Sequence, residues 1–272
     1  MTEVPSDEAD LDIQVCASSG LELRAAVGAQ GWRISQAKYG PLNPGRRDSN
    51  RPGANPDGWK SWQRWDVPGH RTIYVAEQKV TAFAEVLSCF KLKLGDIGPA
   101  DLSQYVDDLE GDGWDEVTAE WQQRNFMAPG QLPASWRQDR LMYLITLPYS
   151  GWFIAATTAE SMAATAKAIG SRLALLGVSE MDLSLLTSGR RDVTCEIAEW
   201  IHGYVLGDGS YAHGIEFPSR HDGSACWAVW LRGLDDGQDL ASEPTQSDDG
   251  TSIDLQDAAL QTVLRRFNLH CH

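Results

Sequence analysis

Glu85 is the residue whose type and surroundings first suggest chemistry. It lies in the run RTIYVAEQKVTAFAEVL (residues 71–87), which predicts a short strand followed by a helix. At about 100° per residue, Glu85 points away from the apolar face of that helix. The residues beside it are small and uncharged, and no Lys or Arg lies one turn away to pair with it. Most helix glutamates are simply solvated, so two interpretations stay open: a plain surface, or the wall of a functional site.

A basic loop precedes this helix. Residues 33–71 hold eight Lys or Arg against three Asp, a local charge of +5 within an acidic chain. The segment is rich in Gly, Pro and Asn and contains Trp59, Trp62 and Trp65, so it predicts a loop suited to binding phosphates and stacking on a flat ring. The alternative is an Arg-rich surface loop balanced by nearby acids.

The length, composition and net charge of the chain limit the kind of partner it can bind. With 272 residues, 42% of them hydrophobic, and 11 Trp, it has enough apolar material for a sizeable core. The formal net charge of −15 argues against nucleic acid or an anionic membrane surface as partner, because both attract positive charge. A small molecule or a protein is the expected partner.

The cysteines and apolar segments indicate the compartment. The five cysteines are scattered and show no C-x-x-C spacing, which favours neither a disulfide framework nor a zinc knuckle. No apolar run approaches the roughly 18 residues of a membrane span, and the N-terminal residues are acidic. We expect a cytoplasmic protein without a metal site, and the C-terminal His-Cys-His is not assigned as one.

Strands and helices alternate irregularly, which predicts an α+β fold. Short β-prone runs occur at residues 71–76, 141–147, 151–156, 181–186, 214–217 and 226–231. A helix is predicted over 157–177, with Thr157 and Glu160 as a capping box and Gly177 at its C-terminal end. A second helix is predicted over 190–202.

Three separated segments together resemble the RES domain family, which is named for an arginine, a glutamate and a serine. They are WRI (32–34), QRWDVPGHRTIYVAEQKVTAFAEV (63–86) and HGIEFPSRH (213–221). Carried over one residue at a time, the resemblance implies Arg33, Arg64, Tyr74, Glu85 and Ser219 as the site. The chain departs from the family pattern at Asp66, where Asn is usual, and at Phe217, where Tyr is common.

The resemblance implies an ADP-ribosyltransferase-like fold of mixed sheets with flanking helices in a single domain. It also implies a toxin that cleaves the nicotinamide–ribose bond of NAD, as a glycohydrolase or phosphorylase. In this scheme Glu85, Arg64, Tyr74 and Ser219 are catalytic, and NAD is bound by Arg33 together with Arg64, Tyr74 and Ser219. NAD is the substrate, and no cofactor is expected. The implied protein partner is an Xre-type antitoxin, and a homodimer is allowed.

The expected organisation is an acidic N-terminal tail (1–20), the RES domain (21–234), an acidic linker (235–254) and a C-terminal helix (255–272). The stretch 91–140 looks longer than the family minimum and carries an acidic run at 107–116, suited to reshaping the site or binding a partner.

Other functions stay open beside the toxin. An ADP-ribosyltransferase would move ADP-ribose onto a protein, and a noncatalytic module would keep only the fold. The sequence contains no Gly-x-Gly-x-x-Gly after a strand and no Gly-x-Ser-x-Gly, which disfavours a Rossmann dehydrogenase and a serine hydrolase. His202, His213 and His221 are candidate general bases, although a structural histidine is the commoner case.

Overall fold

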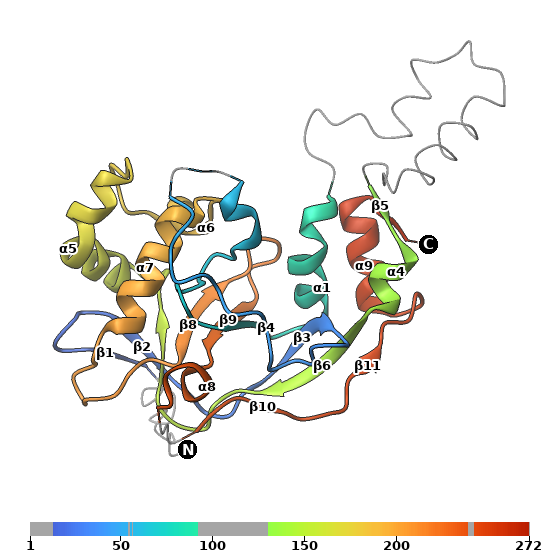
Figure 1. Ribbon diagram of the computed structural model, residues 1–272, viewed down its shortest axis with the longest axis horizontal. Coiled ribbons are helices and arrows are strands. Elements are labelled where there is room, and N and C mark those ends of the chain that lie inside the picture. The colour runs from blue at the N-terminus through green and yellow to red at the C-terminus, as the bar shows by residue number, and fades with distance from the viewer. Residues whose placement is uncertain (1–12, 54, 56, 92–129, 239–241, 272) are drawn as a thin grey trace, which may run out of the picture.

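The computed structural model describes residues 13–53, 55, 57–91, 130–238 and 242–271. A ten-stranded sheet runs through this part of the chain, and helices flank it at two ends (Figure 1). In spatial order its strands are β1 (Ile13–Val15), β2 (Glu22–Ala25), β7 (Trp152–Ala155), β8 (Gly214–Pro218), β9 (Ala225–Trp230), β4 (Thr72–Ala76), β3 (Gln30–Gln36), β6 (Arg140–Thr146) and β10 (Thr245–Gln246), with β11 (Thr251–Ser252) also on β6.

Strand directions are mixed. β7 and β8 run parallel, whereas the other paired strands of this sheet are antiparallel. A separate parallel pair joins β5 (Gln131–Leu132) to β12 (His270–Cys271). The expected α+β architecture with flanking helices is therefore confirmed.

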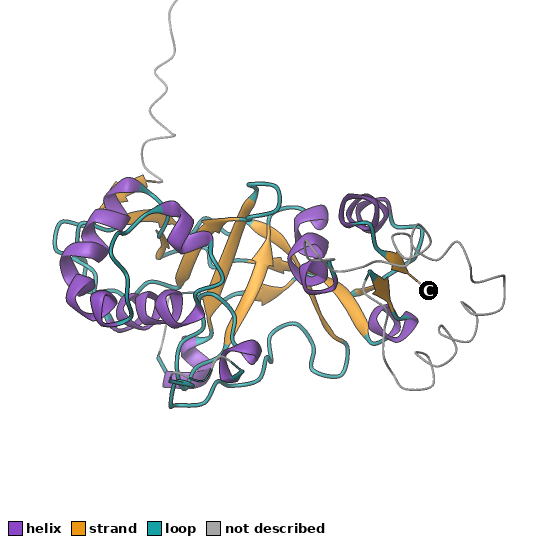
Figure 2. Cartoon of the chain, turned by 90° about the horizontal axis from the view of Figure 1, so that it is seen from above, coloured by secondary structure: helices purple, strands orange, loops and turns teal. Residues whose placement is uncertain are grey.

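The helices form two groups, which the view from above also separates (Figure 2). One group is α5 (Ala159–Leu175), α6 (Leu183–Thr187) and α7 (Arg191–Gly203). The other is α1 (Lys79–Leu87), α4 (Ala134–Gln138) and α9 (Ala258–Phe267), in which α9 packs along α1. The short α8 (Arg232–Asp236) follows β9, and 3₁₀ turns lie at Gly58–Ser61 and Ser88–Phe90.

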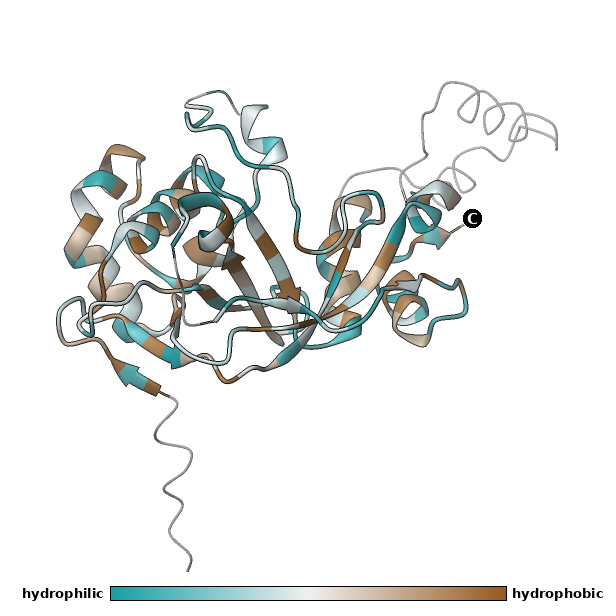
Figure 3. Cartoon of the chain, turned by 60° about the horizontal axis from the view of Figure 1, so that its bottom comes forward, coloured by the Kyte–Doolittle hydropathy of each residue, from teal (hydrophilic) through white to brown (hydrophobic). Residues whose placement is uncertain are grey.

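Two apolar clusters use the two faces of the sheet. Along β4 and β9 successive side chains point to opposite faces, so Ile73 and Val75 join one cluster while Ala76 joins the other. The cluster that contains Ala76 packs against the helices. The cluster that contains Ile73 and Val75 lies on the opposite face and includes Tyr143 of β6 and Phe153 of β7. Hydrophobic bands recur along the central strands in Figure 3.

Most of the predicted elements are confirmed, with two local errors. The run 181–186 is not a strand: α6 begins there because the Asp182 carboxylate accepts the Leu185 N–H at 2.6 Å. The N-cap of α5 is Thr158, whose hydroxyl accepts from the Ser161 N–H, so the capping box at Thr157 is wrong by one residue. Gly177 does follow the helix end with φ +77°, a conformation that favours glycine.

Parts of the segments expected as acidic tail and linker form strands. Residues 13–15 form β1 on β2, while residues 1–12 lie outside the described residues. Within 235–254, β10 and β11 pair with β6, and the Asp248 carboxylate accepts the Leu144 N–H at 3.0 Å and the Gly250 N–H at 3.2 Å. Acidic residues here satisfy backbone donors at a sheet edge, which composition alone does not reveal. Within the expected C-terminal helix (255–272), α9 covers Ala258–Phe267 and β12 follows at His270–Cys271, while residues 92–129 of the long stretch lie outside the described residues.

Candidate active site

Glu85 and Ser219 meet, although 134 residues separate them. The Ser219 hydroxyl donates to Glu85 Oε1 at 2.7 Å, and the His221 N–H donates to the same hydroxyl oxygen at 3.2 Å. Ser219 is buried, and Glu85 is half-buried. A hydroxyl that both accepts and donates holds the carboxylate in one orientation. The motif-based prediction that these two residues share a site is consistent with this contact.

The β8–β9 hairpin explains why Glu85 has no charged neighbours on its helix. Thr81, one turn before Glu85, donates from Oγ1 to Asp222 Oδ2 at 2.8 Å. Thr81 and Glu85 therefore both bind the hairpin loop, since residues four apart share a helix face. The loop is closed by the Ser219 N–H to Ser224 O bond at 2.8 Å. The small face of α1 is a packing surface for this loop and not a plain solvated face.

Arg64 brings a buried cation to the pair. Its side chain is 7% exposed, and its guanidinium carbon lies 5.3 Å from the Phe217 ring centre. Burial lowers the pKa of Arg64, while the Glu85 carboxylate raises it. Its Nε has no hydrogen-bond partner among the described residues. An unpaired buried donor is costly.

Positive charge gathers around Arg64. Arg220 and Arg191 both lower the pKa of Arg64, which places their charges within electrostatic range. Arg191 comes from the first turn of α7 and donates from Nε to Trp62 O at 3.0 Å. The sequence analysis did not select Arg191 or Arg220, although Arg220 directly follows Ser219. Three arginines within electrostatic range of one another suit an anionic ligand such as a pyrophosphate.

Tyr74 supports the Arg64 loop. Its hydroxyl donates to Asp66 Oδ1 at 3.0 Å and accepts the Trp65 N–H at 2.9 Å, and its ring lies edge-on to Phe217. Burial and the Asp66 charge raise its pKa well above the usual range. Since the hydroxyl is used within the protein, the geometry gives Tyr74 a positioning role; contact with a ligand stays a prediction.

Asp66 is fully buried and central to this loop. Its carboxylate also accepts the Gln63 N–H at 2.7 Å and pairs with Arg47 Nε at 2.6 Å. Arg47 thus balances the charge that Asp introduces where the family usually has the neutral Asn.

Arg33 lies deeper than expected. Its Nε donates to Pro41 O at 2.8 Å and its NH1 donates to Tyr74 O at 3.2 Å. Burial lowers its pKa to about 10, and the acidic side chains that act on it are Tyr74 and the charged Asp66, not Glu85. The described contacts therefore bind Arg33 to the backbone of the sheet and loop, and direct contact with NAD stays a prediction.

The tryptophans of the basic loop have a different role from the expected one. Trp65 is fully buried and Trp62 is 3% exposed, so both belong to the interior. Trp59 is half-buried and donates from Nε1 to Gly53 O at 2.9 Å. The prediction that these three rings stack on a ligand is wrong for Trp62 and Trp65, because apolar burial is the stronger demand on such large rings.

His221 completes the surroundings of Glu85. Burial lowers its pKa, while the Glu85 carboxylate raises it. Its ring lies edge-on to Phe267 of α9 at 5.4 Å between centres. The C-terminal helix thereby touches the hairpin that holds Ser219. Of the three histidines considered as bases, His213 binds Ser150 O through Nε2 at 2.7 Å, as a structural histidine does.

The fold is a mixed α+β domain, and its site is a serine-bound carboxylate beside the buried Arg64. The RES domain family model matches residues 30–251, so the chain belongs to the RES domain family. No curated protein matches the chain. Among solved structures, the crystal structure of the M. tuberculosis MbcT–MbcA toxin–antitoxin complex contains a chain with 12% identity and a TM-score of 0.42, with 94% of each chain covered. Across the described residues, no helix has both the length and the apolar character of a membrane span.

Proposed function

We propose that this RES-domain chain is a toxin-type enzyme that cleaves the nicotinamide–ribose bond of NAD. The observation that carries the proposal is the Glu85 carboxylate, held by the Ser219 hydroxyl at 2.7 Å, beside the buried Arg64. Family membership supports it, because the family is known for NAD-consuming chemistry.

The reaction breaks the bond between ribose C1′ and the nicotinamide nitrogen. The bonding electron pair leaves with the ring, which becomes neutral nicotinamide, and positive charge develops on the ribose. A carboxylate near that charge stabilises the transition state, which assigns this task to Glu85. An oxygen of water or phosphate then bonds to C1′, and the proton released from water, or from a protonated phosphate, passes to solvent.

Ser219 and the arginines divide the remaining work. Ser219 keeps Glu85 in one orientation, so that little reorganisation is needed in the transition state. Arg64, whose charge lies within electrostatic range of Glu85, is the leading candidate to bind the pyrophosphate, and Arg191 and Arg220 add positive potential. Tyr74 and Asp66 hold the loop that carries Arg64.

Two other functions share the same residues. An ADP-ribosyltransferase would use the same first step and pass ADP-ribose to a protein side chain. A noncatalytic module would not need a carboxylate positioned beside a buried arginine, so the Glu85–Ser219 contact favours an enzyme.

An NAD-consuming enzyme needs control in its own cell. We therefore propose an Xre-type antitoxin as partner, whose acidic or carboxylate-terminated segment would occupy the arginine cluster in competition with NAD. The net charge of −15 would also attract a basic partner surface.

The test is to incubate purified protein with NAD, with and without phosphate and cell extract, and to identify the products by mass. The proposal predicts free nicotinamide together with ADP-ribose or its phosphorylated form. Appearance of ADP-ribose only on extract proteins would favour the transferase, and intact NAD under every condition would favour the noncatalytic module.

A further inference from the structure

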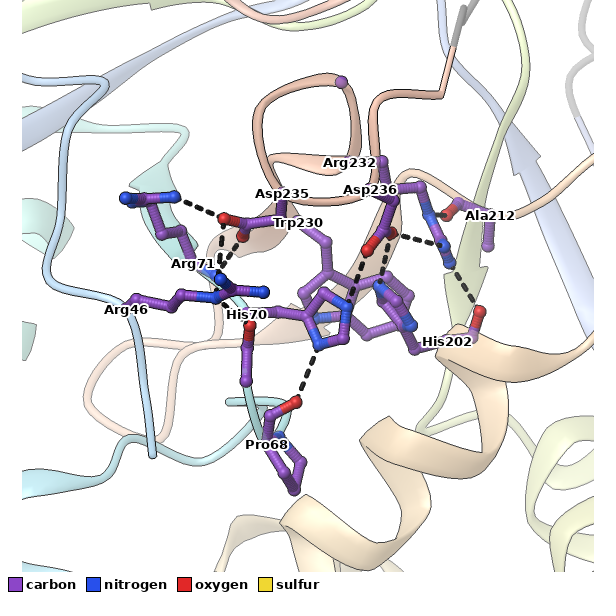
Figure 4. A network of polar contacts seen from close by, with 12 residues as sticks. Arg46, Pro68, His70, Arg71, His202, Ala212, Trp230, Arg232, Asp235 and Asp236 are labelled. Carbon is purple, nitrogen blue, oxygen red and sulfur yellow. Dashed lines mark hydrogen bonds and ion pairs between the residues drawn. The ribbon is translucent and has the colours of Figure 1, made fainter. Parts of the chain in front are cut away.

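Two histidines and one aspartate converge at the other end of the central strands (Figure 4). His70 precedes β4, His202 lies in the last turn of α7, and Asp236 ends α8. Their nearest nitrogen and oxygen atoms all lie within 4.8 Å of one another. The register pairs Thr72 with Trp230 at this end and Ala76 with Cys226 at the Ser219 end, so about 13 Å of strand separates the two places.

His70 presents a lone pair to a carboxylate. Its Nδ1 lies 2.7 Å from Pro68 O, and since a carbonyl oxygen only accepts, Nδ1 carries the hydrogen. In the neutral ring, Nε2 then has no hydrogen, yet it lies 2.9 Å from Asp236 Oδ1. Two acceptors at this distance need a positive species between them, which is either a proton or a metal ion.

The surroundings of His202 favour a metal ion over a proton. It is 8% exposed, and its Nε2 has no hydrogen-bond partner among the described residues. That nitrogen lies 3.8 Å from Asp236 Oδ2. A proton on His70 would leave His202 Nε2 unpartnered, whereas a metal ion would bind all three side chains.

The spacing suits a tetrahedral ion. Zinc binds His nitrogen and carboxylate oxygen at about 2.0–2.2 Å, which places neighbouring ligand atoms about 3.3 Å apart. The separations of 2.9 Å and 3.8 Å lie on either side of that value. The Asp236 side chain is 22% exposed, which gives an ion a route from solvent and leaves room for a water as fourth ligand.

Arg232 lies near the Asp236 carboxylate without hydrogen-bonding to it, so the carboxylate can bind an ion. Arg232 donates from Nε to Ala212 O and from NH2 to His202 O, and its NH1 is 4.0 Å from Asp236 Oδ2, beyond a hydrogen bond. The neighbouring Asp235 is occupied separately, by Arg71 and Arg46 (Figure 4).

We propose that His70, His202 and Asp236 bind one zinc-class divalent ion that ties the loop before β4 to the ends of α7 and α8. The sequence analysis assigned no metal because the three residues lie at positions 70, 202 and 236 with no local spacing pattern. The site is separate from Glu85 and stands independently of the proposed NAD chemistry.

The test uses untagged, chelator-treated full-length protein carrying His270→Gln and His272→Gln, since a His-x-His end can bind zinc by itself. Calorimetric titration with ZnCl₂ is compared between this parent and its Asp236→Asn and His70→Gln forms. Asp249→Asn serves as control, because Asp249 is exposed and distant in sequence from the cluster. Cobalt(II) absorption reports coordination geometry.

The proposal predicts one tight equivalent of zinc in the parent and the control, and its loss in both site variants. With zinc at about 100-fold above its dissociation constant, the melting temperature of the parent should rise by about 5–10 °C. Absence of a tight equivalent in the parent, or equal binding by the parent and a folded Asp236→Asn form, would overturn the site and leave only the direct His70–Asp236 contact.

Discussion

Replacing Tyr74 by phenylalanine tests whether the Tyr74 hydroxyl positions the loop that carries Arg64 or contacts NAD. The change keeps the ring against Phe217 but removes the hydroxyl that joins Asp66 Oδ1, at 3.0 Å, to the Trp65 N–H, at 2.9 Å. Both Trp65 and Asp66 are fully buried, so water does not readily replace the lost bonds.

The expected loss of unfolding free energy comes from two groups, the Asp66 carboxylate and the Trp65 N–H, because each loses a hydrogen-bond partner. A buried group left unsatisfied costs about 1–3 kcal/mol. Asp66 keeps the Gln63 N–H and Arg47, so the combined loss should be about 2–4 kcal/mol of unfolding free energy. At about 2–4 °C per kcal/mol, the melting temperature should fall by about 4–16 °C.

Urea unfolding followed by circular dichroism measures this loss, and NAD kinetics on the folded variant measure the site. Tyr204→Phe is the matched control, because Tyr204 is also half-buried and no hydrogen bond of its hydroxyl is found among the described residues. We expect a destabilised variant whose turnover when folded changes much less than that of Glu85→Gln. Unchanged stability together with loss of turnover would refute the positioning role and assign the hydroxyl to the ligand.

Further predictions concern the remaining site residues and the partner. Ser219→Ala should lower NAD turnover by about 10–100-fold, because it removes a hydrogen bond to a charged group worth about 1.5–3 kcal/mol; a normal rate would show that Ser219 does not orient Glu85. Arg64→Lys keeps the charge but loses the planar fork, so KM for NAD should rise at least ~10-fold with less effect on melting; an unchanged KM contradicts phosphate binding. Arg33→Ala should lower the melting temperature more than it raises KM, since two backbone carbonyls lose their donor; the reverse pattern would place Arg33 on NAD. Expression of the wild type in bacteria should stop growth and deplete NAD while Glu85→Gln does not, and co-expression of the antitoxin should restore growth; harmless expression of active protein, with NAD intact, rules out the toxin.

The order of loop, strand and helix in residues 63–86 was sufficient to predict β4 and α1, whereas the role of Glu85 was implied by the family resemblance and stays a prediction. Local periodicity did not show what Glu85 faces, because the hairpin that holds it lies 134 residues further along the chain. The helical wheel treats the far side of α1 as solvent, whereas Thr81 binds Asp222 there.

Composition led to wrong expectations where the residues of polar segments lie in the interior or bind the backbone. The segment 235–254 reads as an acidic linker, yet Asp248 accepts two backbone N–H groups and the Asp235 side chain is fully buried beside Arg71. Similarly, a loop rich in Gly, Pro and Arg suggested exposed rings, while Trp62 and Trp65 are buried. Long-range partners decide such cases, and a single sequence does not display them.

The most direct test of the account is the rate of nicotinamide release from NAD by Glu85→Gln. This change keeps the shape of the side chain and its ability to accept the Ser219 hydroxyl, but removes the negative charge that is proposed to stabilise the ribose cation. Glu180→Gln, at an exposed position, is the matched control. We predict at least a ~100-fold lower rate for Glu85→Gln and a wild-type rate for the control. Wild-type turnover by correctly folded Glu85→Gln would contradict the proposed mechanism.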